Sequence, residues 1–361
     1  MEEINSAWEN FINNNCIMKQ KKKCKAKQLK KIPKCGDIYI STKTMIAYFN
    51  QEIPLYNIFW KLPILNYNIP QNGIVKKQMK INCTNEDEVK KLEQKINKDK
   101  NKIISVDILK QIKFKNGSIK DNRKINIGIS KKDLTCFKKK RKGAFYNCFV
   151  IILRIKFENI FKEIHIKIFN TGKLEIPGIQ KTKFLLLSLN LLIEILQPYF
   201  VKKISYNINN IETVLINSNF NCGFYINRDN LYHILKYKYN FNVAFDSCSY
   251  PGIQCKYYYN KKKNNNNGLC NCLTKCDKKG KGYGDGECFE ISFMIFRTGS
   301  VLIVGHCEEN IIHHIYKNIK QILQDEYNNI LIINNEKQKK TKKKKVKKKI
   351  LIIKKQPICK S

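Results

Sequence analysis

The alternation of apolar and polar residues predicts two copies of one hairpin. Residues 166–180 read IKIFNTGKLEIPGIQ, and residues 293–307 read FMIFRTGSVLIVGHC. Both contain I-F-x-T-G, followed by five residues and a second Gly, and the matching glycines are 127 positions apart. This pattern predicts a strand that ends at Phe, a tight turn in which Gly takes a positive φ, and a second apolar strand.

The segments around the two hairpins also correspond. Each hairpin is followed by a helical pattern and preceded by a β segment, and further upstream lies a strand with a short helix. The unit is strand, helix, several strands and long helix, and it occurs twice. It predicts an α+β protein with an antiparallel sheet and helices on one side. The expected helices are Ile53–Leu62, Phe184–Leu196, Asn230–Tyr237 and Asn310–Leu323, and the expected upstream strands are Ile38–Asn50, Phe149–Ile155, Thr213–Phe224 and Tyr250–Tyr259.

Two polar segments interrupt this organisation. Residues 82–142 are rich in Lys, Asn and Asp, and residues 260–288 form a Cys- and Gly-rich stretch. Because matching elements stand on both sides, we interpret both as insertions at hairpin tips rather than as long internal loops.

The charge indicates a polyanionic partner. The 361 residues carry 69 Lys and Arg against 29 Asp and Glu, a net charge of +40. Residues 19–34 contain nine Lys and residues 337–361 contain thirteen, and neither segment contains an acid. We predict that these segments belong to disordered arms, 1–35 and 331–361. Nucleic acid is the first expectation for such a charge, and the Lys and Asn bias of an A+T-rich genome is the alternative explanation.

Several classes of protein are not supported. The acidic start lacks the apolar region of a secretory signal, and no apolar run is long enough to span a membrane. We expect an intracellular protein whose fifteen Cys stay reduced. No arrangement of His, Cys, Asp or Glu matches a catalytic motif, so we do not expect an enzyme.

The hairpins Ile168–Gly178 and Ile295–Gly305, together with Pro251-Gly252-Ile253, resemble the TATA-box-binding protein family. The resemblance covers roughly residues 36–70 and 143–328. It implies an α+β saddle, in which two pseudo-twofold repeats of curved antiparallel sheet carry two long helices on the convex side. The repeats would span 36–200, with the insertion at about 82–142, and 201–330, with the insertion at about 260–288.

The resemblance also implies a function. Members of this family bind A+T-rich promoter DNA in the minor groove, bend it and recruit general transcription factors and RNA polymerase subunits. The divergence and the insertions are similar to those of the forms found in large DNA viruses, and an A+T-rich protist paralogue is the alternative source. A monomer in the nucleus or in a viral factory of the host cytoplasm is expected, with double-stranded DNA as its ligand and no membrane partner.

Site residues follow from the family pattern position by position. The aromatic wedges fall on Phe169, Phe296 and Tyr250. The fourth wedge is ambiguous among Cys148, Phe149 and Phe145, and Phe149 is preferred. The remaining DNA-binding positions are the central Asn217 with Thr42 as its counterpart, the phosphate donors Thr171 and Thr298, the rim cations Arg154, Lys173 and Lys256, and the apolar Leu302 and Val304.

Some positions depart from the family pattern. Glu175 and Pro177 stand in the first hairpin where the second has Leu302 and Val304, and a carboxylate is unfavourable against the negative potential of the groove. These departures, with Thr42 and Ser300, motivate an alternative function, a protein-interaction platform that has lost DNA bending.

The second insertion contains a candidate metal site. Cys270, Cys272, Cys276 and Cys288 can supply four thiolates to a structural zinc ion, with Cys255 and Cys248 as substitutes. The alternative is a disordered loop with incidental thiols. No other cofactor is expected.

Overall fold

The computed structural model describes residues 32–98, 103–114, 119–135, 145–263, 266–277, 280 and 282–332. The chain divides into two compact units, Met1–Lys34 and Cys35–Ser361. Most of both predicted arms, residues 1–31 and 333–361, lies outside the described residues. All elements below belong to the second unit.

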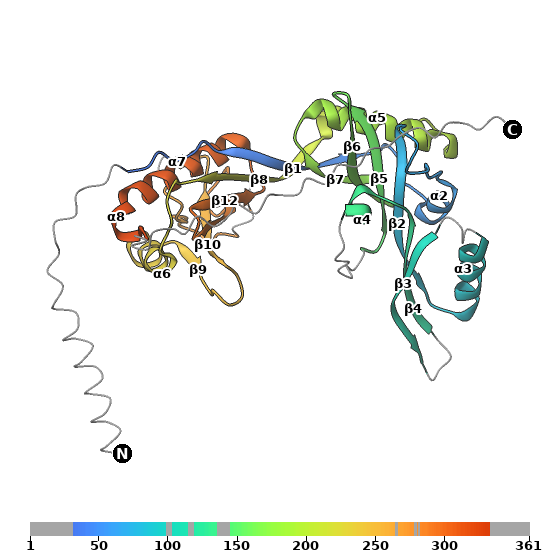
Figure 1. Ribbon diagram of the computed structural model, residues 1–361, viewed down its shortest axis with the longest axis horizontal. Coiled ribbons are helices and arrows are strands. Elements are labelled where there is room, and N and C mark those ends of the chain that lie inside the picture. The colour runs from blue at the N-terminus through green and yellow to red at the C-terminus, as the bar shows by residue number, and fades with distance from the viewer. Residues whose placement is uncertain are drawn as a thin grey trace, which may run out of the picture. The chain divides into compact units, whose positions relative to one another are not determined.

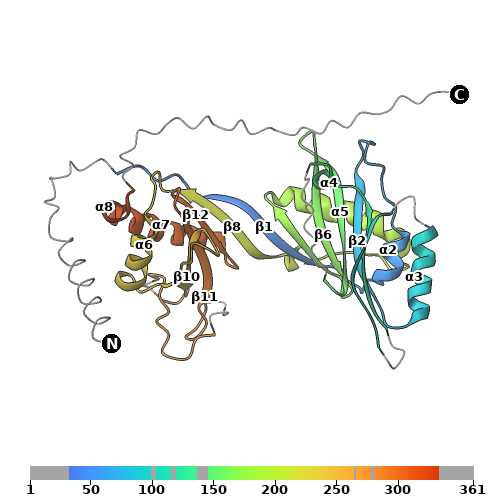
Figure 2. The same ribbon diagram turned by 60° about the horizontal axis from the view of Figure 1, so that its bottom comes forward.

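Twelve strands form one antiparallel sheet with the order β3-β4-β2-β5-β6-β7-β1-β8-β12-β11-β10-β9 (Figures 1 and 2). The strands β1 and β8 pair with each other near the middle of this order. The bounds are β1 Tyr39–Tyr48, β2 Gly73–Cys83, β3 Ile103–Lys113, β4 Ile119–Gly128, β5 Cys148–Phe157, β6 Ile160–Phe169, β7 Lys173–Ile179, β8 Glu212–Asn221, β9 Asn242–Ala244, β10 Gly252–Tyr259, β11 Phe289–Phe296 and β12 Ser300–Gly305.

The described residues also contain seven α-helices. The four helices expected from the sequence are confirmed within a few residues, as α2, α5, α6 and α7. After α6 the chain continues as one π-helical turn, Ile234–Lys238. The bounds are α2 Leu55–Lys61, α3 Glu86–Lys98, α4 Lys131–Thr135, α5 Thr182–Leu196, α6 Arg228–His233, α7 Glu309–Asp325 and α8 Tyr327–Ile330.

The fold class expected from the family resemblance is wrong. A saddle with two long helices was expected, whereas the described residues form an open twelve-stranded sheet with seven short helices, the longest of 17 residues. The main physical reason lies in residues 82–142, which we interpreted as an insertion at a hairpin tip. They contribute α3, β3, β4 and α4, so the sheet extends beyond β2.

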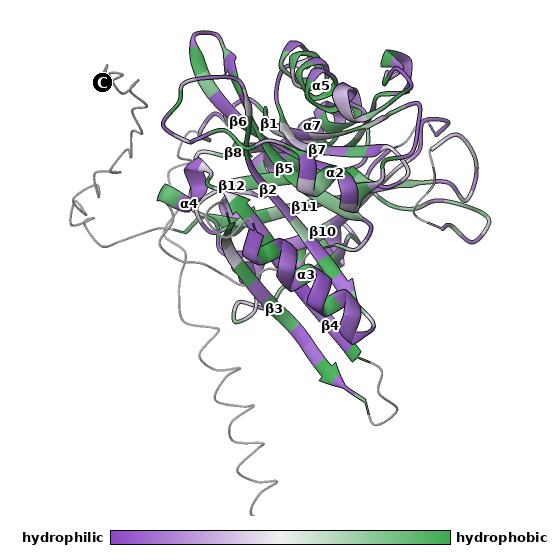
Figure 3. Ribbon diagram, turned by 90° about the vertical axis from the view of Figure 1, so that its right-hand side faces the viewer, coloured by the Kyte–Doolittle hydropathy of each residue, from purple (hydrophilic) through white to green (hydrophobic). Residues whose placement is uncertain are grey.

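A few apolar residues within the Lys- and Asn-rich segment 82–142 explain why the sheet extends beyond β2. Ile125 and Ile127 of β4 alternate with polar neighbours and are buried, as is Leu92 of α3. In Figure 3 the ribbon of α3, beside β3 and β4, is coloured mainly as hydrophilic residues. The polar residues are not confined to the solvent side, because Asp121, Asn122, Arg123 and Asn126 of β4 are also buried, and Arg123 is paired with Asp121 at 2.8 Å.

Two hydrophobic cores lie on one face of the sheet. The first is formed by residues of β1, β2 and β4–β7 with α2, α3 and α5, and the second by residues of β8 and β10–β12 with α6, α7 and α8. We call the parts of the chain that build them the first half (β1–β7) and the second half (β8–β12). The other side of the sheet, where alternate residues point away from both cores, is called the open face.

The two predicted hairpins are confirmed and have the same register. Lys167 of β6 lies opposite Glu175 of β7, and Met294 of β11 lies opposite Leu302 of β12, each 127 positions later. Gly172 and Gly299 close the turns with φ of 79° and 78°. Each glycine N–H donates to the carbonyl of the preceding Phe, at 3.0 and 2.9 Å. A positive φ favours Gly at these positions, which explains the repeated T-G pair.

Candidate nucleic-acid interface

The open face of the second half is apolar along its hairpin. Ile291, Phe293 and Ile295 of β11 are buried in the core, and the residues between them point to the other side. These are Ser292 and Met294, Phe296 follows on the same side, and β12 adds Leu302 and Val304, all of them partly buried. The side chains predicted for apolar contact therefore lie on one face of adjacent strands.

Two of the predicted wedges, Tyr250 and Phe296, lie together at the edge of this face. Their ring centroids are 5.9 Å apart with an interplanar angle of 59°. Gly252 lies opposite Phe296 across β10 and β11, and a Cβ at Gly252 would be 3.0 Å from a carbon of each ring. The Pro-Gly pair of the sequence thus provides the backbone surface on which both rings pack.

The structure corrects the assignment of the fourth wedge. Cys148 lies opposite Phe169 as Gly252 lies opposite Phe296, so the counterpart of Tyr250 is Tyr146, two residues before Cys148. Tyr146 is exposed, and Lys80 Nζ lies 3.6 Å from its ring centroid.

Phe149, the residue preferred from the sequence, is fully buried in the first core, where its ring lies 6.0 Å from that of Phe59. Side chains alternate between the two faces of a sheet, so a shift by an odd number of residues along the strand moves a side chain to the opposite face. Phe149 is three residues after Tyr146 and therefore points into the core. Counting by cross-strand partner rather than from Arg154 would have identified Tyr146.

Polar residues occupy the middle of the open face, on β1 and β8. Thr42 and Asn217 lie directly opposite each other. Thr42 is not the counterpart of Asn217, however. Thr44 faces Pro177 as Asn217 faces Val304, and these two partners are equivalent positions of the hairpins. The β1–β8 pairing agrees, because Thr44 faces Leu215 as Asn217 faces Thr42, two residues earlier in each strand.

The amide of Asn217 has an unsatisfied atom. Its Oδ1 is buried and has no hydrogen-bond partner among the described residues. Buried polar atoms are nearly always paired, so any group that completes the hydrogen bonding of this oxygen has to be a donor.

Of the three predicted rim cations, Lys173 and Lys256 lie near the solvent, whereas Arg154 is buried. Lys173 is partly buried beside Phe169, with Nζ 5.9 Å from the ring centroid, and Lys256 Nζ lies 2.6 Å from a Glu290 carboxylate oxygen. Both remain near the open surface, as do the exposed Thr171 and Thr298 of the two turns.

Arg154 is not a rim cation. It is 1% exposed, and its guanidinium donates to the backbone carbonyls of Tyr67, Ile69 and Gln71, with Tyr67 at 2.8 Å and Gln71 at 3.1 Å. A planar guanidinium with five donors can hold three carbonyls of one loop at once, so Arg154 fixes the segment that precedes β2.

Glu175 has a partner that the sequence did not reveal. Lys167 lies opposite it across β6 and β7, and Lys167 Nζ is 2.5 Å from Glu175 Oε1. The carboxylate that the open face presents in the first half is therefore compensated by an adjacent cation.

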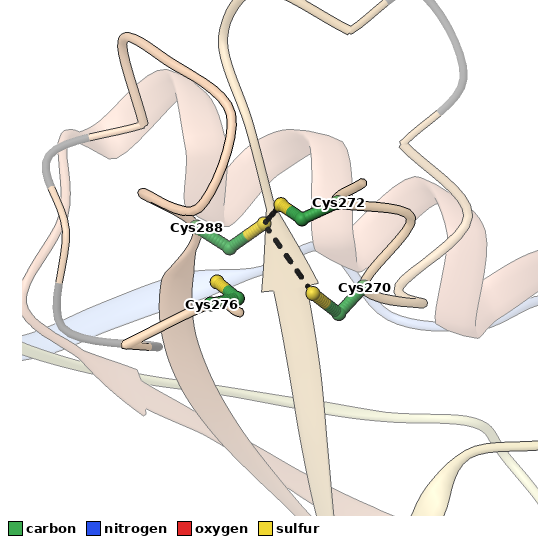
Figure 4. Close-up of side chains that lie close together, drawn as sticks. All are labelled: Cys270, Cys272, Cys276 and Cys288. Carbon is green, nitrogen blue, oxygen red and sulfur yellow. Dashed lines mark hydrogen bonds between the residues drawn. The ribbon is translucent and has the colours of Figure 1, made fainter. Parts of the chain in front are cut away.

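The four predicted cysteine ligands converge at the β10–β11 connection (Figure 4). Their Sγ atoms all lie within 4.8 Å of one another. Cys288 Sγ is 3.4 Å from Cys272 Sγ and 3.9 Å from Cys270 Sγ. The cluster can bind a metal ion. The proposed substitutes Cys255, which is buried in the second core, and Cys248, which is exposed, are not part of it.

An acidic residue holds the loop between these ligands. Asp285 accepts hydrogen bonds from the N–H groups of Leu273 and Thr274 at 3.0 and 2.7 Å and from the Thr274 hydroxyl at 2.7 Å. These hydrogen bonds hold the pKa of Asp285 well below its ordinary value. The turn from Cys272 to Cys276 is thereby fixed by protein contacts as well as by its position in the cluster.

Comparison of the sequence with protein-family models and with curated proteins gives no match. Within the described ranges, no helix is both long enough and apolar enough to cross a membrane.

Proposed function

We propose that this chain is a TATA-box-binding-like transcription initiation factor, without enzymatic activity, that binds A+T-rich promoter DNA in the minor groove. The observation that carries the proposal is the open face of the second half. It combines the aromatic pair Tyr250 and Phe296, the apolar Leu302 and Val304, and Asn217, whose amide Nδ2–H can donate to the acceptor atoms that A·T pairs present in the minor groove. Minor-groove proteins use apolar wedges to unstack base steps and amides to contact base edges.

The charge supports a nucleic-acid ligand over an apolar protein partner. A net charge of +40 attracts the phosphate backbone, and the apolar patch by itself would not select DNA. In this proposal the lysines provide affinity, while Asn217 and the rings distinguish A·T from G·C pairs. The proposed ligand and partners are promoter DNA, general transcription factors and RNA polymerase subunits. The proposed location is the nucleus or a viral factory.

A mobility-shift titration with A+T-rich and G+C-rich duplexes of equal length tests the proposal. We expect preference for the A+T-rich duplex at every salt concentration, with affinity falling as salt rises. Equal affinity for both duplexes, with a salt dependence explained by lysine contacts alone, would exclude groove reading.

A second candidate is a protein-interaction platform that has lost DNA bending. It is favoured by the first half, where Glu175 and Pro177 replace apolar residues on the open face. A fluorescence-transfer measurement on end-labelled A+T-rich duplex separates the two functions, because only a bending protein brings the two ends closer together.

We further propose that the ion bound by the four cysteines is structural zinc. Tetrahedral Zn–S bonds of about 2.3 Å place the sulfurs about 3.8 Å apart, and the two sulfur–sulfur distances of 3.4 and 3.9 Å are close to that value. The loop also contacts α7, where Asn318 Nδ2 donates to the Asn266 carbonyl at 2.9 Å. Zinc in this position stabilises the loop against the second half.

A further inference from the structure

The helix α4 differs from the other described helices in the face that it covers. It is the one α-helix in the described ranges that contributes no buried residue to either core. Its Asp133 carboxylate lies 2.8 and 2.9 Å from Lys76 Nζ on β2. Lys76 lies opposite Ile152, which in turn lies opposite His165. The chain neighbours of Ile152 and His165, namely Ile151, Leu153, Ile164 and Ile166, belong to the first core, so Ile152 and His165 point to the open face. Lys76, opposite Ile152, lies on the same face, and α4 therefore lies there too.

A second set of contacts fixes the same segment. The Lys131 N–H donates to both carboxylate oxygens of Glu163 on β6, at 3.0 and 2.9 Å. Asp133 also accepts from the Ser130 N–H at 2.9 Å and from the Ser130 hydroxyl at 2.6 Å. Ser130–Thr135 is therefore attached to two strands, β2 and β6, on either side of β5.

The covered strand is β5. Ile152 points to the open face, outside the first core, yet it is only 4% exposed. In the second half the equivalent position, four residues after Gly252, is Lys256, whose side chain is 40% exposed. The described helices of the second half, α6, α7 and α8, all contribute to the second core, so they do not cover its open face.

We propose that Ser130–Thr135 acts as a wall on the open face of the first half, so that only the second half reads the minor groove. This inference rests on the proposed DNA-binding function. A duplex approaching β2, β5 and β6 meets α4, and α4 presents the exposed Lys131 and Lys132, which suit phosphates rather than base edges. The first half then contributes electrostatic contact, and the requirement for A·T pairs is confined to the half-site under Tyr250, Phe296 and Asn217.

The experiment compares three duplexes of equal length, one A+T-rich throughout, one A+T-rich in one half only, and one G+C-rich throughout. For the wild-type chain we expect nearly equal affinity for the first two and weaker binding to the third. 5-Iodouracil placed in the single A+T-rich half-site should photo-crosslink to peptides of the second half.

Two variants release the wall by different means, Asp133→Ala and Lys76→Met. Both should make the fully A+T-rich duplex several-fold preferred over the half-site duplex, because the first half becomes available to the groove. Glu86→Ala, which removes an exposed ion pair with Lys113 at the end of β3, is the matched control and should behave like the wild type. Thermal unfolding of each protein shows whether it is folded.

The possible outcomes separate the two proposals. A wild-type chain that already loses several-fold affinity on the half-site duplex would overturn the wall, as would folded variants that keep the wild-type ratio. A wild-type chain that shows no preference between the fully A+T-rich and fully G+C-rich duplexes would overturn the proposed function, and the wall with it.

Discussion

Lys167 and Glu175 lie opposite each other on β6 and β7 and form an ion pair of 2.5 Å on the open face. Removal of the two partners should therefore have opposite effects on DNA affinity. Lys167→Met leaves an uncompensated carboxylate beside the phosphates and should weaken binding by about tenfold, or ~1.4 kcal/mol. Glu175→Gln should strengthen binding, and the double variant should lie near the wild type.

A double-mutant cycle in mobility-shift titrations measures this coupling. The exposed pair Lys181 and Glu158 provides the control, since Lys181→Met removes one paired cation without touching the open face, although the Lys181 side chain is more exposed than that of Lys167, 60% against 23%. If Lys167→Met and Lys181→Met weaken DNA binding equally, then DNA affinity depends only on net charge, and the ion pair of Lys167 and Glu175 does not lie beside the phosphates.

Gly252→Ala tests the aromatic pair. The added Cβ would lie 3.0 Å from carbons of both Tyr250 and Phe296, so the rings must move. We expect loss of most A+T preference and of DNA bending, while thermal stability falls by about 1 kcal/mol or less because the rings are at the surface. Gly284→Ala is the matched control, because its Cβ would meet its nearest neighbour at an ordinary 3.7 Å. Unchanged bending in folded Gly252→Ala would argue against Tyr250 and Phe296 as wedges.

Arg154→Met should destabilise the fold rather than affect DNA contact directly. Three backbone carbonyls lose their donor, and breaking buried charged networks costs about 3–5 kcal/mol. Urea unfolding measures the loss. Lys156→Met on the same strand, where the side chain is exposed, should be close to neutral. A change in DNA affinity without a change in stability would instead restore Arg154 as a rim cation.

Metal content and loop order should depend together on the cysteine cluster. Elemental analysis of the purified chain should find one equivalent of zinc, and Cys288→Ser should reduce this strongly. Hydrogen exchange in residues 266–277 should rise in the variant. Cys248→Ser, which changes an exposed thiol outside the cluster, should leave both measurements unchanged. A metal-free wild-type chain with a protected loop would show that Asp285 and the packing suffice.

Acidification should release α4. Burial raises the pKa of the Asp133 carboxyl, but hydrogen bonds from Lys76 and Ser130 outweigh it and hold the pKa below the ordinary value. A lowered pKa means that the contribution to stability is complete above about pH 4 and is lost as the pH falls further. The other charged groups here are Lys132, Glu163 and His165.

Hydrogen exchange of residues 130–135, corrected for intrinsic rates, should therefore increase below that pH while α5 in the same sample stays protected. In Asp133→Asn the segment should already exchange fast at neutral pH. Equal exchange in variant and wild type would show that the carboxylate does not hold α4.

The elements with regularly spaced apolar residues could be predicted from the sequence. Those in which polar residues occupy many of the positions could not. The hairpins were found because Gly172 and Gly299 require the same backbone conformation. The strand β4 was missed because Lys and Asn fill its polar positions, so that only a few buried Ile residues mark it as a strand.

The site was predicted least well where the position of a residue depends on cross-strand pairing. Tyr250 and Phe296, the proposed wedges, could be placed in the sheet because a Pro-Gly pair marks one strand and the T-G turn marks the other. Tyr146 and Thr44 were missed because a shift of two or three residues along a strand changes which side chain occupies a given place on the sheet. Lys167 was missed because a partner eight residues away becomes adjacent only once the turn is known.

The position of β1 between β7 and β8 has a consequence for synthesis of the chain. Its partners are more than 120 residues downstream, and β8 begins only at Glu212. At about 5–20 residues per second, the ribosome needs roughly ten to thirty seconds to complete the chain from β1 to β8. Both edges of β1 lack their final partners until β7 is made, and the edge that pairs with β8 stays open until the end of that interval. The nascent protein is therefore most vulnerable to wrong strand pairing before its second half emerges.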